Sequence, residues 1–157
     1  MKPFNTPIEV AVRVLNVLAE SHPRALDIGM LVMLDHVVLN TADLGGPPSI
    51  QPALPARVGQ IAVKRPAIQH GLRVLLKANL VEPQASDSGI EYLAREESQY
   101  FLDLLDSSYA QKLATRSRWA IEHFGILSTA EMRVQMRLFL DAWVEEFDLS
   151  ENSRTAQ

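Results

Sequence analysis

Four side chains between residues 22 and 43 could take part in acid–base or metal chemistry, namely His22, Asp35, His36 and Asp43. Asp35 and His36 are adjacent, so on a helix they would point about 100° apart. No histidine pair has the spacing of the H-E-x-x-H zinc motif. We therefore expect Asp35 or His36 to bond the loop backbone at a helix end. A small hydrolase using Asp35, His36 and Asp43 has little support, and intact function after Asp35→Ala and His36→Ala would exclude it.

The second candidate for chemistry is the glycine pair Gly45-Gly46, which begins the stretch GGPPSIQPALPAR. A phosphate-binding loop needs G-x-x-x-x-G-K-[ST] or G-x-G-x-x-G, and neither pattern is present. Pro47 and Pro48 also remove two backbone N–H groups that a phosphate nest would use. We predict a long loop over residues 41–57 that braces the fold or docks a partner.

Patterns for covalent catalysis are missing from the sequence. There is no cysteine, which excludes disulfides, thiolate metal sites and a cysteine nucleophile. No serine lies in a G-x-S-x-G motif. His70 and His123 are single histidines in amphipathic patterns, where structural roles are commoner than ligand roles. We predict that the protein is not an enzyme and needs neither a metal nor a cofactor.

A locally basic segment stands out in a chain whose net charge is −4. No acid lies between Asp43 and Glu82, an interval that contains Arg57, Lys64, Arg65, His70, Arg73 and Lys77. This set favours contact with DNA phosphates or with an acidic partner over a merely solvated helix face. It lacks Asn, Gln and Arg clustered at the helix start, so contact with DNA would be non-specific.

Apolar spacing predicts the helices that would position these residues. Thr6, Pro7 and Glu9 begin a helix that ends near residue 21, because they form a capping box with proline at the first helical position. Asp27 caps a second helix, which ends near residue 40 and is apolar nearly all round, as expected of a central buried helix. A short helix is expected at 58–64, and Pro66 begins a third clear helix.

Further along, two short strands are expected around residues 80–81 and 90–92, joined by the turn Asp87-Ser88-Gly89. Helical patterns follow at 96–105 and 108–124. A capping box at Ser128 and Glu131 begins a last helix that is rich in Met and aromatic residues. Its apolar positions fit core packing and a partner surface equally well; the partner-surface candidates are Met136, Phe139 and Trp143.

The order helix, helix, basic helix and β-hairpin predicts a mainly α fold with a winged helix-turn-helix core, a small β-hairpin wing and additional C-terminal helices. We expect a winged-helix core over residues 1–94, a helical extension over 95–149 packed on it, and a flexible tail over 150–157, within one compact domain. No uncharged apolar run approaches membrane-spanning length, and the first residues read as an amphipathic helix, so a cytoplasmic protein is expected.

The sequence also resembles a known family over about residues 3–125. The resemblance depends on Phe4-Asn5-Thr6-Pro7, on Leu34-Asp35-His36, on Gly71-Leu72 before Leu80-Val81-Glu82, and above all on DLGGPPS at residues 43–49. These segments are similar to the middle component of bacterial ABC three-component systems, which themselves resemble the Lamassu anti-phage defence systems.

The resemblance implies a non-catalytic adaptor that bridges an SMC-like ATPase subunit to an effector subunit, often a nuclease, and that helps to sense foreign DNA. In this setting the Gly/Pro loop, with Gly45, Gly46, Pro47 and Pro48, would be a docking or bracing element. The competing hypothesis is a free-standing winged-helix transcription regulator. Such a regulator should form a dimer and bind a palindromic site tightly, whereas an adaptor should bind DNA weakly and depend on its protein partners.

Overall fold

The computed structural model describes residues 6–50 and 57–139, and for residues 57–63 it describes the backbone only. Helix α1 (Pro7–Ser21) begins as the sequence predicts, because Thr6 Oγ1 accepts a hydrogen bond from the Glu9 N–H at 3.2 Å. Its apolar face is buried, including Val10, Val14 and Leu18. The amphipathic pattern of this helix therefore marks the side that packs inward.

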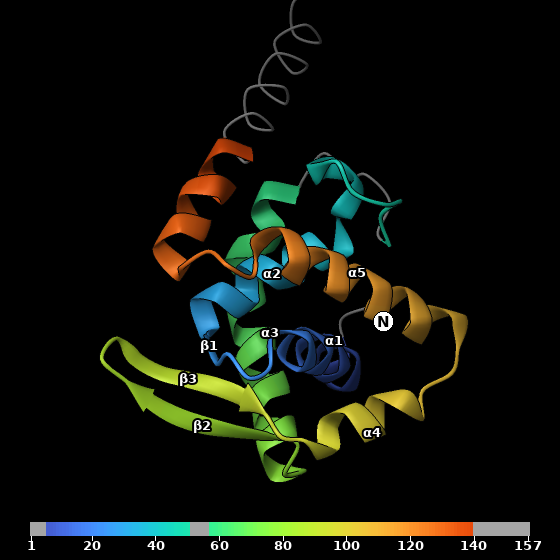
Figure 1. Cartoon of the computed structure of the whole chain (residues 1–157). Coiled ribbons are helices and arrows are strands. Elements are labelled where there is room, and N and C mark those ends of the chain that lie inside the picture. The colour runs from blue at the N-terminus through green and yellow to red at the C-terminus, as the bar shows by residue number, and fades with distance from the viewer. Residues whose placement is uncertain (1–5, 51–56, 140–157) are drawn as a thin grey trace, which may run out of the picture.

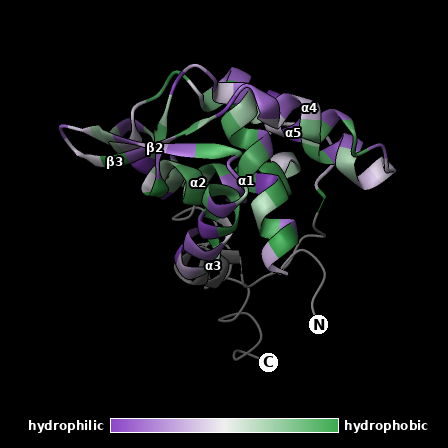
Figure 2. Ribbon diagram, turned by 90° about the horizontal axis from the view of Figure 1, so that it is seen from below, coloured by the Kyte–Doolittle hydropathy of each residue, from purple (hydrophilic) through white to green (hydrophobic). Residues whose placement is uncertain are grey.

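Helix α2 (Ile28–Leu39) is the central helix of the fold. Asp27 caps it by accepting a hydrogen bond from the Met30 N–H at 2.8 Å, and every residue from Met30 to Leu39 is buried. The prediction of an apolar helix between Asp27 and Asn40 is confirmed. In Figure 2, α2 lies near the middle of the molecule. A short 3₁₀ helix, η1 (Thr41–Leu44), follows directly and begins the loop predicted over residues 41–57.

Helix α3 (Arg57–Lys77) corrects one prediction. We expected a short helix at 58–64 and a new helix from Pro66, but the structure has one continuous helix with Pro66 inside it. A proline removes one backbone hydrogen bond and does not have to end a helix whose two halves are both held by packing. Here Lys64 bonds Asp35 of α2 on one side of the proline, and Ile68 is buried in the core on the other.

The sheet has three antiparallel strands in the order β1-β3-β2. Strands β2 (Val81–Ser86) and β3 (Gly89–Ala94) form the predicted hairpin, and Gly89 adopts a φ of 126° at its turn. Strand β1 (Leu26–Asp27) was not predicted; it is only two residues long and pairs with Glu91 and Tyr92. A strand this short has no periodicity, so only its pairing with the hairpin reveals it.

Two further helices and a third helical segment complete the described chain. Helix α4 (Glu97–Asp103) is short, and helix α5 (Ser108–Phe124) has the predicted bounds. Residues 129–139 are helical, and the predicted capping box is confirmed by reciprocal bonds between Ser128 and Glu131 at 3.0 and 3.1 Å. Residues 150–157, expected to be a flexible tail, lie outside the described residues.

The helices surround α1 and α2, and the hairpin projects from one end (Figure 1). Helix α5 crosses one side of this core, α4 lies at the base of α5, and the 129–139 helix lies on the side toward β1. The mainly helical fold with a hairpin and extra C-terminal helices is therefore as predicted. This arrangement leaves one face of α3 uncovered between the hairpin and the 129–139 helix.

Candidate nucleic-acid interface

The uncovered face of α3 carries a stripe of polar side chains. Ile68, Leu72 and Leu75 are buried toward α1 and α2. Residues spaced by four lie on one face of a helix. On the other side of α3, such a series of exposed residues is formed by Arg65, Gln69 and Arg73.

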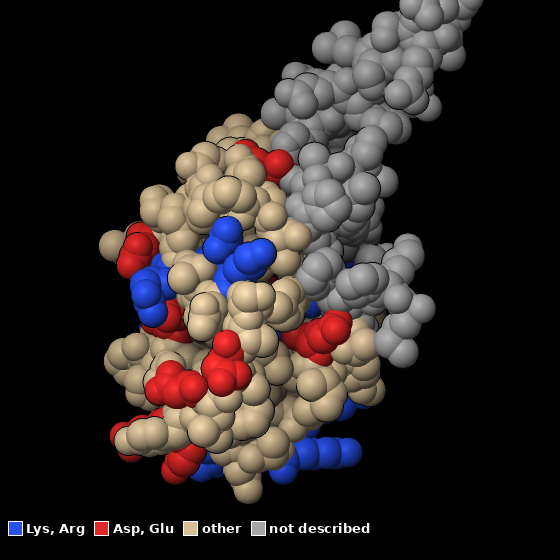
Figure 3. Space-filling model, turned by 90° about the vertical axis from the view of Figure 1, so that its right-hand side faces the viewer, with Lys and Arg blue, Asp and Glu red and all other residues tan. Residues whose placement is uncertain are grey.

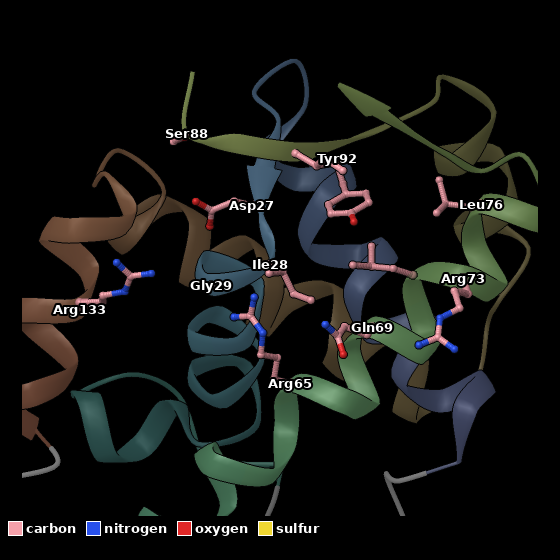
Figure 4. A pocket seen from close by; sticks show the side chains of 12 residues that line it. Asp27, Ile28, Gly29, Arg65, Gln69, Arg73, Leu76, Ser88, Tyr92 and Arg133 are labelled. Carbon is pink, nitrogen blue, oxygen red and sulfur yellow. The ribbon is translucent and has the colours of Figure 1, made fainter. Parts of the chain in front are cut away.

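This stripe forms one wall of a groove of about 570 Å³ (Figure 4). The hairpin, the first turn of α2 and the 129–139 helix form the other walls. The lining residues are Asp27, Ile28, Gly29, Arg65, Gln69, Leu72, Arg73, Leu76, Ser88, Ile90, Tyr92 and Arg133. Three of them are arginines, contributed by two helices, and the groove therefore suits an anionic ligand.

Arg133 reaches the groove because the 129–139 helix approaches the start of α2 closely. A Cβ atom at Gly29 would lie 3.2 Å from Arg133 Nη2, so glycine leaves room for the guanidinium. Thr129 Oγ1 donates a hydrogen bond of 2.9 Å to Asp27 Oδ2, while Asp27 Oδ1 caps α2. Both oxygens of Asp27, the acid in the groove, thus accept hydrogen bonds: Oδ1 caps α2, and Oδ2 joins the start of α2 to the 129–139 helix.

The structure separates the predicted basic residues into groups. Arg65 and Arg73 line the groove, whereas His70 and Lys77 are exposed on α3 but do not line it. Lys64 is turned inward and bonds Asp35. The side chain of Arg57 lies outside the described residues.

Sequence reasoning missed two groove residues, Gln69 and Arg133. Gln69 could have been found from its spacing of four from both Arg65 and Arg73. Arg133 lies 60 residues beyond Arg73 in the chain, and no local pattern links them. Only the packing of the 129–139 helix against α2 brings Arg133 to the groove.

A buried network of ion pairs lies next to the N-terminal end of the stripe on α3, at Lys64. Asp35 is 2% exposed, and its Oδ1 accepts a hydrogen bond from Arg13 Nε at 2.8 Å. Its Oδ2 accepts one from Lys64 Nζ, also at 2.8 Å. Asp35 thus ties α1 and α3 to α2. Of the two residues that we expected to bond the loop backbone, Asp35 or His36, Asp35 does not.

The pKa of Asp35 follows from this environment. Burial by itself would raise the pKa of the carboxyl group, because it disfavours the charged form. The positive charges and hydrogen bonds of Lys64 and Arg13 outweigh burial and lower the pKa to about 2. Asp35 is therefore a carboxylate at neutral pH, held between two cations.

The other acid–base candidates lie on three different elements, at the end of α1, in α2 and in η1. The backbone carbonyl of His36 accepts a hydrogen bond from the Asn40 side chain at 2.8 Å, and His22 Nδ1 lies 3.0 Å from the backbone oxygen of Ala94. Asp43 lies in η1. Within the part of the chain that the structure describes, no three His, Cys, Asp or Glu side chains form a group that could hold a metal ion.

The Gly/Pro loop packs against α5 at its described positions, residues 45–50. Gly46 lies against the Trp119 ring: a Cβ atom there would be 2.6 Å from the ring. Arg116 Nη2 donates a 3.0 Å hydrogen bond to the Pro48 carbonyl oxygen. Thr41 Oγ1 donates one of 2.8 Å to the Pro47 carbonyl oxygen. These contacts support the bracing alternative for this part of the loop, and the docking alternative stays a prediction.

Gly46→Leu is expected to displace the loop from α5, since the side chain cannot fit between the backbone and the Trp119 ring. We expect an overpacking cost of about 1–3 kcal/mol in the free energy of unfolding. Urea denaturation measures this cost, and Trp119 fluorescence in a Trp143→Phe background reports on the ring. Gly45→Asn is the matched control, since no atom beyond the adjacent residues lies within 4 Å of a Cβ there and Asn tolerates its φ of 80°. Equal stability of the two variants would contradict the bracing role.

The last helical segment divides its apolar residues between core and surface. Met132 and Met136 are buried, at 0% and 3% exposed, and Phe139 is partly buried. Core packing therefore accounts for Met136 within this chain. Trp143, the third partner-surface candidate, lies outside the described residues.

The order of elements, the small sheet and the groove beside α3 are compatible with the winged helix-turn-helix class. The chain belongs to the family described as middle component 2 of ABC-three component (ABC-3C) systems, which it matches over residues 3–146. No curated protein and no solved structure matches the sequence. Among the described residues, every helix is too short or too polar to cross a membrane.

Proposed function

We propose that this chain is the non-catalytic adaptor of a cytoplasmic anti-phage defence complex. It bridges an SMC-like ATPase subunit to an effector subunit, and its groove beside α3 contacts the backbone of nucleic acid without reading sequence. The observation that carries the proposal is the family match, which spans residues 3–146 and so includes both the hairpin and the C-terminal helices. A component of a multi-subunit system works through its partners.

The charges of the groove support the nucleic-acid part of this proposal. Arg65, Arg73 and Arg133 can each bond phosphate oxygens, which is how most protein–DNA hydrogen bonds are made. The one acid in the groove, Asp27, uses both oxygens in hydrogen bonds within the protein. Gln69 is the one side-chain amide in the lining, too little for reading a sequence by base edges.

The adaptor role is tested by reconstitution with the proposed ATPase and effector subunits of the same system. We expect one complex that contains all three proteins, and no stable pair of ATPase and effector when this chain is left out. An ATPase and effector that associate equally well without it would refute the bridging role.

Arg73→Gln together with Arg133→Gln should weaken nucleic-acid binding by removing two phosphate contacts. The slope of log K against log salt concentration should become smaller by about 2, or by about 1.5 for a single strand. Fluorescence anisotropy with a labelled duplex and a labelled single strand, at several salt concentrations, measures this change.

Lys112→Gln with Arg118→Gln is the matched control for that experiment, because it changes the net charge equally on α5, away from the groove. Its salt slope should equal that of the unmodified protein. An equal loss in both double variants would mean that net charge, and not the groove, governs binding.

The polar stripe on α3, which contains Arg65 and Arg73, also favours a second candidate function, that of a winged-helix transcription regulator. A regulator would be a homodimer that binds a palindromic site tightly at physiological salt. Sedimentation of the isolated chain, combined with selection of binding sites from random duplexes, separates the two candidates. The adaptor predicts that no sequence is enriched, and a regulator predicts a palindrome.

A further inference from the structure

A second surface, on the opposite side of the molecule from the groove, exposes large apolar side chains. Tyr100 in α4 is 75% exposed, Phe101 is 38% exposed, and Leu104, which follows α4, is 79% exposed. Tyr100 and Leu104 are four residues apart and so lie on one face. Single exposed apolar residues are normal, but three within five residues, on α4 and at its end, favour an interaction site.

This exposure does not result from a loosely attached helix. The inner side of α4 is fixed, since Ser98 is fully buried and its hydroxyl donates a hydrogen bond to the backbone oxygen of Leu80. Leu102 packs partly buried against the core. The helix therefore presents Tyr100 and Leu104 outward from a fixed base.

A groove of about 290 Å³ runs beside α4, between α1 and α5. Its apolar lining includes Leu102, Leu105 and Ala114, and its acidic lining consists of Glu20, Asp103 and Asp106. Arg118 also lines it, with its Nε 3.6 Å from Glu20 Oε1. The rest of the lining includes the polar residues Asn16, Gln99 and Gln111, so the groove is an amphipathic slot flanked by carboxylates.

The charge of this surface selects the kind of partner. Residues 96–111 contain Glu96, Glu97, Asp103 and Asp106 and no lysine or arginine. Figure 3 shows acidic side chains on the lower half of the face that carries this region, with Lys and Arg side chains above them and at the lower edge. The four acids of residues 96–111 repel the phosphates of nucleic acid. They also repel the chain's own C-terminal segment, because residues 140–157 hold five acids and one arginine.

We propose that the α4 surface, formed by Tyr100, Leu104 and the groove between α1, α4 and α5, binds a basic amphipathic helix of a partner subunit. Apolar side chains of that helix enter the slot and cover Leu104, while its lysines and arginines meet Asp103 and Asp106. The inference rests on the proposed adaptor function, because it needs a partner subunit. It assigns protein docking and nucleic-acid binding to opposite ends of the molecule.

The test compares Tyr100→Ala/Leu104→Glu with the unmodified chain in reconstitution with the ATPase and effector subunits. We expect this variant to bind one of the two subunits at least 10-fold more weakly. Overlapping peptides from both subunits, read by fluorescence anisotropy, should identify a binder rich in Lys, Arg and large apolar residues. Asp103→Lys/Asp106→Lys should weaken the binding of that peptide and reduce its salt dependence.

Val134→Ala/Leu138→Glu is the matched control, because both residues are similarly exposed, at 55% and 63%, on the 129–139 helix. It should bind like the unmodified chain, and all variants should keep the same Tm.

Unchanged assembly of Tyr100→Ala/Leu104→Glu, or no basic peptide among the binders, would overturn this inference alone. Failure of the unmodified chain to bind either subunit would overturn the adaptor function itself. Self-association that this variant abolishes would assign the surface to a second copy of the chain.

Discussion

Asp35→Ala is expected to lower the free energy of unfolding by about 3–5 kcal/mol, because it leaves Arg13 and Lys64 as buried cations without their carboxylate. Arg13 is 2% exposed and the Lys64 side chain 12% exposed, so water cannot take the place of Asp35 easily. In a chain of this size the loss corresponds to a fall in Tm of roughly 10–15 °C. Urea and thermal denaturation followed by circular dichroism measure it.

Two further variants separate the cost of unpaired charge from loss of packing. Asp35→Asn keeps the shape and should be less harmful than Asp35→Ala, since its amide oxygen still accepts a hydrogen bond. Arg13→Met/Asp35→Leu/Lys64→Met removes all three charges together and should be more stable than Asp35→Ala. If Asp35→Ala costs less than about 1 kcal/mol, the network is not the buried ion pair described above.

The same network predicts part of the acid sensitivity of the protein. The pKa of Asp35 is about 2 in the folded state, below its ordinary value of 3.8. Its stabilising contribution is therefore complete above pH 4 and is lost as the pH falls from about 4 toward 2, by on the order of 2 kcal/mol. Asp35→Asn cannot titrate, so the difference in stability between it and the unmodified protein should shrink over this pH range.

Gly71→Val is expected to destabilise the protein by about 2–3 kcal/mol or more, because α3 and α1 cross in close contact at this glycine. A Cβ atom at Gly71 would lie 3.1 Å from Val10 Cγ1 and 3.2 Å from the Ala11 backbone nitrogen. The two further methyl groups of valine would press against α1 and separate the helices. Urea denaturation gives the loss, and binding assays at the groove show whether α3 has moved.

Two control variants test whether the close helix crossing causes this loss of stability. Gly71→Ala should be within about 1 kcal/mol of the unmodified protein, because the slight crowding is offset by the higher helix propensity of alanine. His70→Val introduces valine at the neighbouring exposed position and should change stability by no more than about 0.5 kcal/mol. Equal effects of valine at residues 70 and 71 would show that the helix crossing is not close.

The local structure was largely determined by the sequence. The capping residues Thr6, Asp27 and Ser128 each begin a helix where predicted, and the turn at 87–89 joins the predicted strands. These signals are local, because a cap or turn depends on residues within about four positions of each other. The apolar periodicity of α1 and α2 likewise shows which faces are buried.

Only the tertiary structure determined which contacts the charged side chains make. Lys64 and Arg65 are neighbours in a basic segment, yet one bonds buried Asp35 and the other lines the groove. The continuity of α3 through Pro66 also depends on packing against α1 and α2. Arg133 joins Arg65 and Arg73 only because the 129–139 helix folds back onto α2. Sequence spacing carries information over a few residues, whereas these pairings join segments tens of residues apart, so only the packed chain determines them.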